Sequence, residues 1–210
     1  MIFTREYAEW TDFWWEKAGD PMRRRVLLIG DSITRSYRDR VQEIYKPRHI
    51  AIDKLCGSRC AGDPVLTAEL DIATGPLNGY KYDIIHFNNG LHGGCNDTKI
   101  PLEIYKQGIR DIVSVLKRNQ PQAKIVIVTS TYMSPKGDAS FVIDEKLNAF
   151  VLERNAFLHE FAAENGFAVN DLYALTAGNS DFRQSDGIHF DKDSAEKLAS
   201  HVAGFIEKLL

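Results

Sequence analysis

Short, continuously apolar runs alternate along this chain with segments whose apolar residues recur at helical spacing. Continuous rather than alternating apolar runs are typical of strands that are covered on both faces. The predicted strands span Val26–Ile29, His49–Ile52, Ile84–Phe87, Ile125–Thr129 and, more weakly, Phe167–Asn170. The predicted helices span Ile33–Tyr45, Pro64–Ala73, Pro101–Asn119, Leu147–Asn165 and Ser194–Leu210. This alternation predicts a single domain over residues 1–210, an α/β/α sandwich around a parallel sheet of about five strands.

Residues 1–20 are predicted to form a helical extension that packs on this domain. Aromatic side chains at helical spacing indicate a helix over Arg5–Lys17, with Trp10 and Trp14 turned toward the core. The role of Trp15 is left open, because indole rings also form platforms on which sugar rings pack.

Charge and hydropathy exclude several classes of function. The 210 residues carry a formal net charge of -3 and a pI near 6.1, so no electrostatic footprint for nucleic acid is present. The basic run Arg23–Arg25 is interpreted as a solvated entry to the first strand. No apolar stretch approaches the ~20 residues of a membrane span, and the N-terminus does not resemble a signal peptide. We therefore expect a cytoplasmic protein that acts on a small molecule, without a membrane or nucleic-acid partner.

Three cysteines, Cys56, Cys60 and Cys95, fall in two of the loops that follow predicted strands. In a chain without a secretory signal, reduced thiols are expected. A metal cluster that also uses His92 is the alternative, but the spacing fits a zinc site only loosely, and no metal is predicted.

Candidate chemistry lies near both ends of the chain. Ser32 follows a buried strand and Gly30-Asp31, and ligands of parallel sheets bind beyond the carboxyl ends of the strands. His189 closes the segment Asp186-Gly187-Ile188-His189 in a loop before the last helix, from which it can reach the same edge. A serine hydroxyl is a poor nucleophile until an imidazole takes its proton, and a nearby carboxylate orients that imidazole. The two segments are therefore interpreted as halves of one catalytic site.

The motifs Gly30-Asp31-Ser32-Ile33-Thr34 and Asp186-Gly187-Ile188-His189 resemble the first and last signature blocks of the GDSL/SGNH hydrolases. The resemblance implies a flavodoxin-like three-layer fold and serine-dependent ester hydrolysis without a cofactor. It implies that Ser32 is the nucleophile, His189 the general base and then acid, and Asp186 the residue that orients the imidazole.

The resemblance also implies an oxyanion hole, to which the Ser32 N–H contributes. The family's second block supplies a glycine N–H, for which Gly57 is the first choice and Gly62 the reserve. Its third block usually reads Gly-x-Asn-Asp, whereas this chain reads Gly90-Leu91-His92. Aligning the glycines places His92 at the asparagine position, and an imidazole N–H can donate. Asn88 and Asn89 stay as alternatives, and His86 is interpreted as a core histidine.

Three functions are compatible with these residues. The first is hydrolysis of a small acyl ester, such as an acetyl ester of a carbohydrate or a short-chain ester, through an acyl-enzyme. The second is acyl transfer to an alcohol by the same triad. The third is a ligand-binding module without catalysis on the same fold, which the departure in the third block would favour.

Overall fold

Six strands form one sheet in the computed structural model, which describes residues 5–20, 22–94, 99–137 and 141–210. Five of these strands are parallel and lie in the spatial order β3-β2-β4-β5-β6. Their bounds are Arg25–Gly30 (β2), Ala51–Gly57 (β3), Ile84–Asn88 (β4), Lys124–Val128 (β5) and Ala168–Asn170 (β6). The five predicted parallel strands are confirmed, and a sixth strand is added at one edge.

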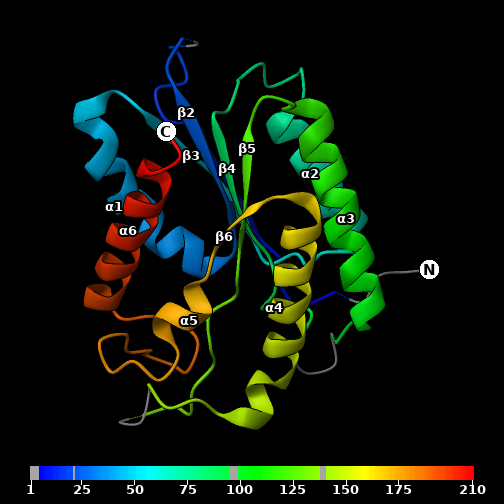
Figure 1. The fold of residues 1–210 in the computed structure, drawn as a ribbon, viewed down its shortest axis with the longest axis vertical. Coiled ribbons are helices and arrows are strands. Elements are labelled where there is room, and N and C mark those ends of the chain that lie inside the picture. Colours follow the sequence, from blue (N-terminus) through cyan, green and yellow to red (C-terminus); the bar gives the residue numbers. More distant parts are fainter. Residues whose placement is uncertain (1–4, 21, 95–98, 138–140) are drawn as a thin grey trace.

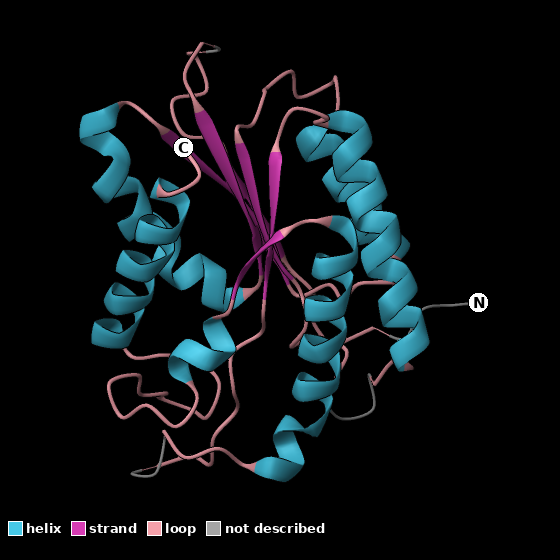
Figure 2. Ribbon diagram, viewed as in Figure 1, coloured by secondary structure: helices cyan, strands magenta, loops and turns pink. Residues whose placement is uncertain are grey.

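Helices cover both faces of the sheet, as the three-layer prediction requires (Figures 1 and 2). One face carries α1 (Ser32–Tyr45), α5 (Leu172–Thr176) and α6 (Lys192–Glu207). The other face carries α2 (Pro64–Thr74), α3 (Leu102–Asn119) and α4 (Glu145–Asn165). A short 3-10 helix, η1 (Lys46–Arg48), follows α1. Within the described residues, none of the helices combines the length and apolarity that crossing a bilayer demands.

The core is divided between these two faces by the strand period of two. Along β2, Val26 and Leu28 pack with α1 and α6, whereas Leu27 and Ile29 pack with the helices on the opposite face. All four side chains are buried. This two-sided burial is the reason that the strand appears in the sequence as an uninterrupted apolar run.

The prediction of an N-terminal helix is wrong. The segment instead forms β1 (Thr11–Trp14), which pairs antiparallel with β3 at the edge of the sheet. Side chains alternate along it: Phe13 packs against the core and stacks on Trp15 at 5.4 Å, while Trp14 is 51% exposed. The aromatic residues favour an edge strand, because pairing with β3 buries one face of such a segment. The expected core position of Trp14 is corrected for the same reason.

The interpretation of Arg25 as a solvated residue is also wrong. Its guanidinium is buried, donates to the Asp53 carboxylate at 2.9 and 3.0 Å, and lies 4.0 Å from the centre of the Tyr80 ring. It also donates to the backbone carbonyls of Glu16, Lys17 and Asp20. Burial raises the pKa of the Asp53 carboxyl, against the lowering effect of Arg25. The pair therefore ties the segment after β1 to the start of the sheet.

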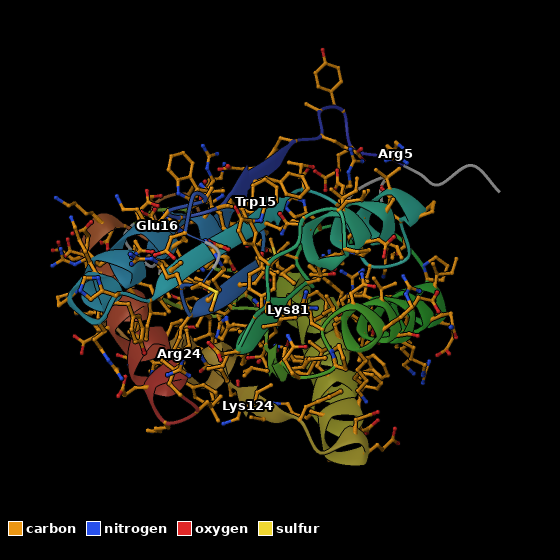
Figure 3. All side chains as sticks on the ribbon, turned by 90° about the horizontal axis from the view of Figure 1, so that it is seen from above. Arg5, Trp15, Glu16, Arg24, Lys81 and Lys124 are labelled. Carbon is orange, nitrogen blue, oxygen red and sulfur yellow. The ribbon has the colours of Figure 1, made fainter. Side chains whose placement is uncertain are left out.

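Figure 3 looks onto this end of the sheet, where Arg24, Lys81 and Lys124 mark the beginnings of β2, β4 and β5. The parallel strands run from here toward the lower half of Figure 1, where the loops that follow them gather. The two ends of the sheet therefore differ in role: buried and surface charges tie the first end together, and the second carries the candidate chemistry.

Replacing Arg25 by Met should lower the free energy of unfolding by about 3–5 kcal/mol, because the Asp53 carboxylate loses its partner inside the core. Adding Asp53→Asn should recover part of that loss, since the unpartnered carboxylate is then removed from this site. Urea unfolding of the two variants measures this, and a double variant no more stable than Arg25→Met would contradict it.

Candidate active site

Ser32 is the first residue of α1, directly beyond the carboxyl end of β2. Asp31 caps the helix, and its Oδ1 accepts a hydrogen bond from the N–H of Ile33 at 2.9 Å. Gly30 provides the close approach between strand and helix, because a Cβ at this position would lie 2.1 Å from Oγ1 of Thr34. The local sequence thus places the Ser32 hydroxyl at a rigid strand-to-helix junction.

His189 is held in a tight loop at the same edge of the sheet. The loop is closed by an isolated antiparallel bridge between Gln184 and Phe190. Phe190 is buried and packs edge-on against Tyr132, and Gln184 donates to the Tyr132 carbonyl at 2.6 Å. A core residue that follows it directly therefore anchors His189.

The structure brings Ser32, His189 and Asp186 into one hydrogen-bonded chain. The Ser32 hydroxyl lies 2.7 Å from Nε2 of His189, although the two residues are 157 positions apart. On the other side of the ring, Nδ1 of His189 lies 2.7 Å from Oδ2 of Asp186. A neutral imidazole with its proton on Nδ1 donates to Asp186 and accepts from Ser32, which is the arrangement that general-base activation of a serine requires.

Asp186 stays ionised in this position. Partial burial raises the pKa of its carboxyl, but hydrogen bonds from the His189 ring and from the N–H groups of His189 and Ile188 outweigh it and lower that pKa to about 2. The two backbone bonds, at 2.8 and 3.0 Å, orient the carboxylate. Gly187 permits the turn with a φ of +92°. Asp186 can therefore orient and stabilise a protonated His189 without taking its proton.

Ser32 and His189 open into a cavity of about 360 Å³, a volume within the range of small-molecule sites. Apolar side chains from three loops form much of its wall, together with polar residues of the N-terminal segment. Its lining residues are Glu6, Tyr7, Asp31, Ser32, Leu91, His92, Gly93, Met133, Ile188 and His189. Glu6 and Tyr7 carry no sequence signal for this position, because the N-terminal segment reaches the cavity only through tertiary contacts.

The third-block candidates for the oxyanion hole occupy different positions. His92 lines the cavity, with Nδ1 2.8 Å from a carboxylate oxygen of Glu6. The Asn88 amide donates to the Val128 carbonyl, and the Asn89 amide donates to the Arg59 carbonyl. Both asparagine amides are therefore engaged with backbone carbonyls, and His92 is the candidate of the three that lines the cavity together with Ser32.

The second-block glycines lie away from the lining of this cavity. Gly57 is the last residue of β3 and is covered by β1, so that a Cβ there would lie 2.9 Å from the Trp10 carbonyl. Gly62 packs against α3 with a φ of +100°. Close packing therefore explains why a glycine stands at each of these two positions. The role of either glycine as an oxyanion donor stays a prediction.

Arg154 on α4 contacts the third-block loop, which comprises residues 90–93. The sequence did not indicate this contact. Its buried guanidinium donates to the carbonyls of Gly90, His92 and Gly93 at 2.7, 2.8 and 2.7 Å. It also lies 4.5 Å from the centre of the Tyr105 ring. Three charge-assisted bonds from one side chain fix the backbone that carries His92.

The remaining histidine and cysteine predictions concern residues away from the triad. His86 is a core histidine, as predicted: burial lowers its pKa to about 3, and its Nε2 accepts from the Asn170 amide. Cys56 and Cys60 are buried free thiols, and burial raises the pKa of Cys60 to about 12. Cys95 lies outside the described residues. Within the residues that the structure describes, no three His, Cys, Asp or Glu side chains are grouped to hold a metal.

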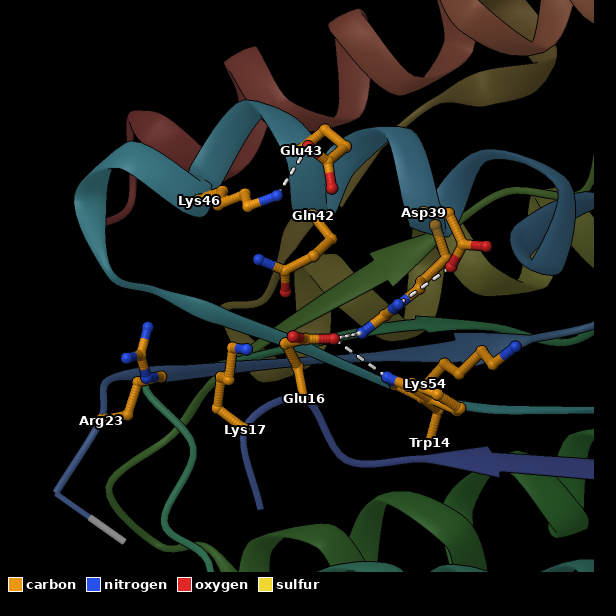
Figure 4. Close-up of a pocket in the computed structure, with 10 residues that line it drawn as sticks. Trp14, Glu16, Lys17, Arg23, Asp39, Gln42, Glu43, Lys46 and Lys54 are labelled. Atoms are coloured by element: carbon orange, nitrogen blue, oxygen red, sulfur yellow. Dashed lines mark hydrogen bonds and ion pairs between the residues drawn. The ribbon is translucent and has the colours of Figure 1, made fainter. Parts of the chain in front are cut away.

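A second cavity, of about 440 Å³, lies between α1 and the segment that follows β1 (Figure 4). Its charged groups are largely engaged with one another: Lys46 with Glu43, and Arg38 with both Asp39 and Glu16. The indole of Trp14 also donates to Glu16. The ten lining residues include no serine, cysteine or histidine, so the chemistry described above belongs to the smaller cavity.

No family model and no curated protein matches this chain. Solved structures, in contrast, do match it. A GDSL-like lipase from Bacteroides thetaiotaomicron has a TM-score of 0.68 at 14% identity, covering 89% of each chain. A carbohydrate acetylesterase from Sinorhizobium meliloti has a TM-score of 0.67 at 14% sequence identity, and the match covers 90% of this chain and 100% of the other. A carbohydrate esterase family 3 protein from Talaromyces cellulolyticus has a TM-score of 0.65 at 15% sequence identity, and the match covers 89% of this chain and 97% of the other.

The fold of this chain is therefore that of the GDSL/SGNH hydrolases. The agreement extends over nearly the whole of each compared chain. The flavodoxin-like architecture implied by the resemblance is confirmed, with the antiparallel β1 as an addition to the predicted sheet.

Replacing Arg154 by Leu should lower the free energy of unfolding by about 2–5 kcal/mol, because three buried carbonyls lose their donor. Arg40→Leu is the matched control: Arg40 is exposed on α1, so its loss should cost about 0.5 kcal/mol or less. Denaturant unfolding compares the two, and equal stabilities would contradict the role given to Arg154.

Proposed function

We propose that this chain is a serine esterase that hydrolyses a small acyl ester through an acyl-enzyme. The observation that carries the proposal is the chain of two 2.7 Å contacts that joins the Ser32 hydroxyl, the His189 ring and the Asp186 carboxylate at the edge of a cavity. The compared structures support it, since they include esterases with the same fold.

In the proposed reaction, Oγ of Ser32 attacks the ester carbonyl while its proton moves to Nε2 of His189. The tetrahedral intermediate collapses, and the same proton passes from His189 to the departing alcohol. Water then attacks the acyl-enzyme, giving its proton to His189, and the carboxylic acid leaves as Ser32 is reprotonated. Asp186 stabilises the protonated ring in both halves of the reaction.

The oxyanion of each intermediate needs donors near Ser32. The N–H of Ser32 itself lies at the start of α1, where the helix dipole favours negative charge. His92 is the proposed side-chain donor in place of the family's asparagine, because it lines the cavity while Asn88 and Asn89 bond to the backbone elsewhere. The backbone donor expected of the second block, Gly57, is not among the residues that line the cavity, so its role has no support beyond the resemblance.

The cavity favours a short acyl group. At about 360 Å³ it has to hold both the acyl group and the part of the alcohol next to the ester. Leu91, Met133 and Ile188 supply apolar contacts, and Glu6 and His92 supply polar ones. Together with the carbohydrate esterases among the compared structures, this supports an acetyl ester of a carbohydrate as the substrate.

A fluorophosphonate probe should label the protein at Ser32, and Ser32→Ala should abolish both labelling and ester hydrolysis. Ser36→Ala, one turn further along α1, is the matched control and should keep both, since the Ser36 hydroxyl donates to the Ile33 carbonyl within the same helix. Mass spectrometry of the labelled protein locates the adduct. Folded protein that does not react would favour the binding module instead.

His92→Ala should lower kcat on an activated acetyl ester by about 100- to 1000-fold, because one oxyanion donor is lost. His159→Ala, at an exposed histidine on α4 that pairs with Asp171, should leave kcat unchanged. Steady-state kinetics, with circular dichroism to verify folding, measure the effect. A kcat close to that of the unchanged protein would move the role to Asn88 or Asn89.

A further inference from the structure

The active-site cavity has two walls of different chemistry. On one side, Leu91 and Ile188 pack against an apolar cluster that contains Met133, which is 8% exposed. The other wall comes from the N-terminal segment, residues 5–10, which contributes Glu6 and Tyr7. The Glu6 side chain is 32% exposed, and Tyr7 is fully exposed. The cavity is therefore apolar on its enclosed side, and polar and aromatic on the side that opens to solvent.

The two walls suit the two halves of an ester. A bound ester places its acyl and alcohol parts on opposite sides of the carbonyl carbon that Ser32 attacks. A short acyl chain gains from the apolar wall, because contact there removes its surface from water. An alcohol rich in hydroxyl groups would lose hydrogen bonds at that wall. The open wall, formed by the N-terminal segment, is therefore the one that suits the alcohol.

The N-terminal segment is fastened on both sides of its two cavity-lining residues. Before them, the Arg5 guanidinium donates to the Asp63 carboxylate at 2.8 and 3.1 Å (Figure 3 labels Arg5). After them, the Trp10 N–H donates to the Ser58 hydroxyl at 3.0 Å, and the Trp10 carbonyl accepts from the Ser58 N–H at 3.1 Å. A wall held in this way loses little conformational freedom when a ligand binds.

The charge of the lining favours a neutral alcohol. Glu6 and Asp31 supply two carboxylates, and Lys and Arg are absent from the described residues that line the cavity. Oε1 of Glu6 lies 2.8 Å from Nδ1 of His92. A carboxylate has acceptor sites on both oxygens, so Glu6 can accept from hydroxyl groups as well. A negatively charged alcohol would be repelled by the same carboxylate.

We propose that Glu6 and Tyr7 are specificity-determining residues that bind the alcohol part of the ester, and that this alcohol is a neutral sugar. Glu6 accepts hydrogen bonds from the sugar hydroxyls, and the Tyr7 ring packs on the face of the sugar, a combination of aromatic and polar contacts that is common in ligand sites. This inference rests on the proposed esterase function. The bond changes and proton transfers stay with Ser32, His189 and the leaving alcohol.

Three esters that share an acetyl group test the role of Tyr7 and of Glu6. They are a monoacetylated methyl glucoside, the methyl glucuronide acetylated at the same position, and ethyl acetate, whose alcohol is too small to span the open wall. The first two differ only in one carboxylate, and the third lacks the sugar. Steady-state kinetics give kcat/KM for each.

In Tyr7→Ala, the ratio of kcat/KM on the glucoside to that on ethyl acetate should fall by about three- to tenfold, because the contact between ring and sugar is lost. The change should lie in KM more than in kcat. Trp14→Ala is the matched control, because Trp14 is an exposed aromatic residue that lines the other cavity, and it should leave the ratio unchanged.

In Glu6→Gln, the ratio of kcat/KM on the glucuronide to that on the glucoside should rise by about tenfold, because the repulsion between two carboxylates is removed. Both esters form the same oxyanion, so an effect transmitted through His92 cancels in this ratio. Glu103→Gln, which removes an exposed carboxylate that pairs with Lys106 on α3, is the matched control and should leave the ratio unchanged.

A binding measurement gives a readout without turnover. Ser32→Ala protein should bind the acetylated methyl glucoside in calorimetric titration, and adding Tyr7→Ala should raise the Kd by the same factor as the KM. Equal Kd values in the two proteins would contradict the role of Tyr7.

The inference is overturned by a constant ratio in either variant, or by an unchanged protein that prefers the glucuronide to the glucoside. The fluorophosphonate experiment separates these results from failure of the function itself. Labelled Ser32 with unaltered ratios removes only the roles of Glu6 and Tyr7, whereas unreactive Ser32 removes the esterase proposal as well.

Discussion

The hydrogen bond between the Ser32 hydroxyl and the His189 ring is the interaction on which the proposed chemistry depends. Its two atoms are 2.7 Å apart, yet the residues belong to opposite ends of the chain. A neighbouring part of the fold fixes each residue. Ser32 lies at the junction of β2 with α1, and His189 is followed directly by the buried Phe190. A small movement of either support would cost the contact, because proton transfer needs hydrogen-bond distance.

Two buried guanidinium groups organise loops through backbone carbonyls. Arg25 gathers the segment after β1 at one end of the sheet, and Arg154 gathers the third-block loop at the other. Their balance of charge differs: Arg25 has the Asp53 carboxylate beside it, whereas Arg154 lies over the faces of Tyr105 and Phe150. In both places one side chain satisfies several carbonyls that the irregular backbone leaves without partners.

The agreement between prediction and structure follows the type of signal in the sequence. Core strands such as β2 and β4 were predicted because a strand buried on both faces must be apolar throughout. β1 was not, since the aromatic residues of an edge strand in so short a segment fit helical spacing equally well. Arg25 was misinterpreted because its partner, Asp53, is brought to it only by the pairing of β2 with β3.

The sequence by itself determined the three-layer fold and the residues expected to react, because local patterns predict both. Apolar runs predict the strands of the fold, and short motifs beside strand ends predict the residues expected to react. The tertiary structure alone decided three features. These are the contact of Glu6 with His92, the hydrogen bonds from Arg154 to the third-block loop, and the alternation of faces along β1. Each is a contact between segments distant in the chain, and no local pattern of residues encodes which distant partner folding will supply.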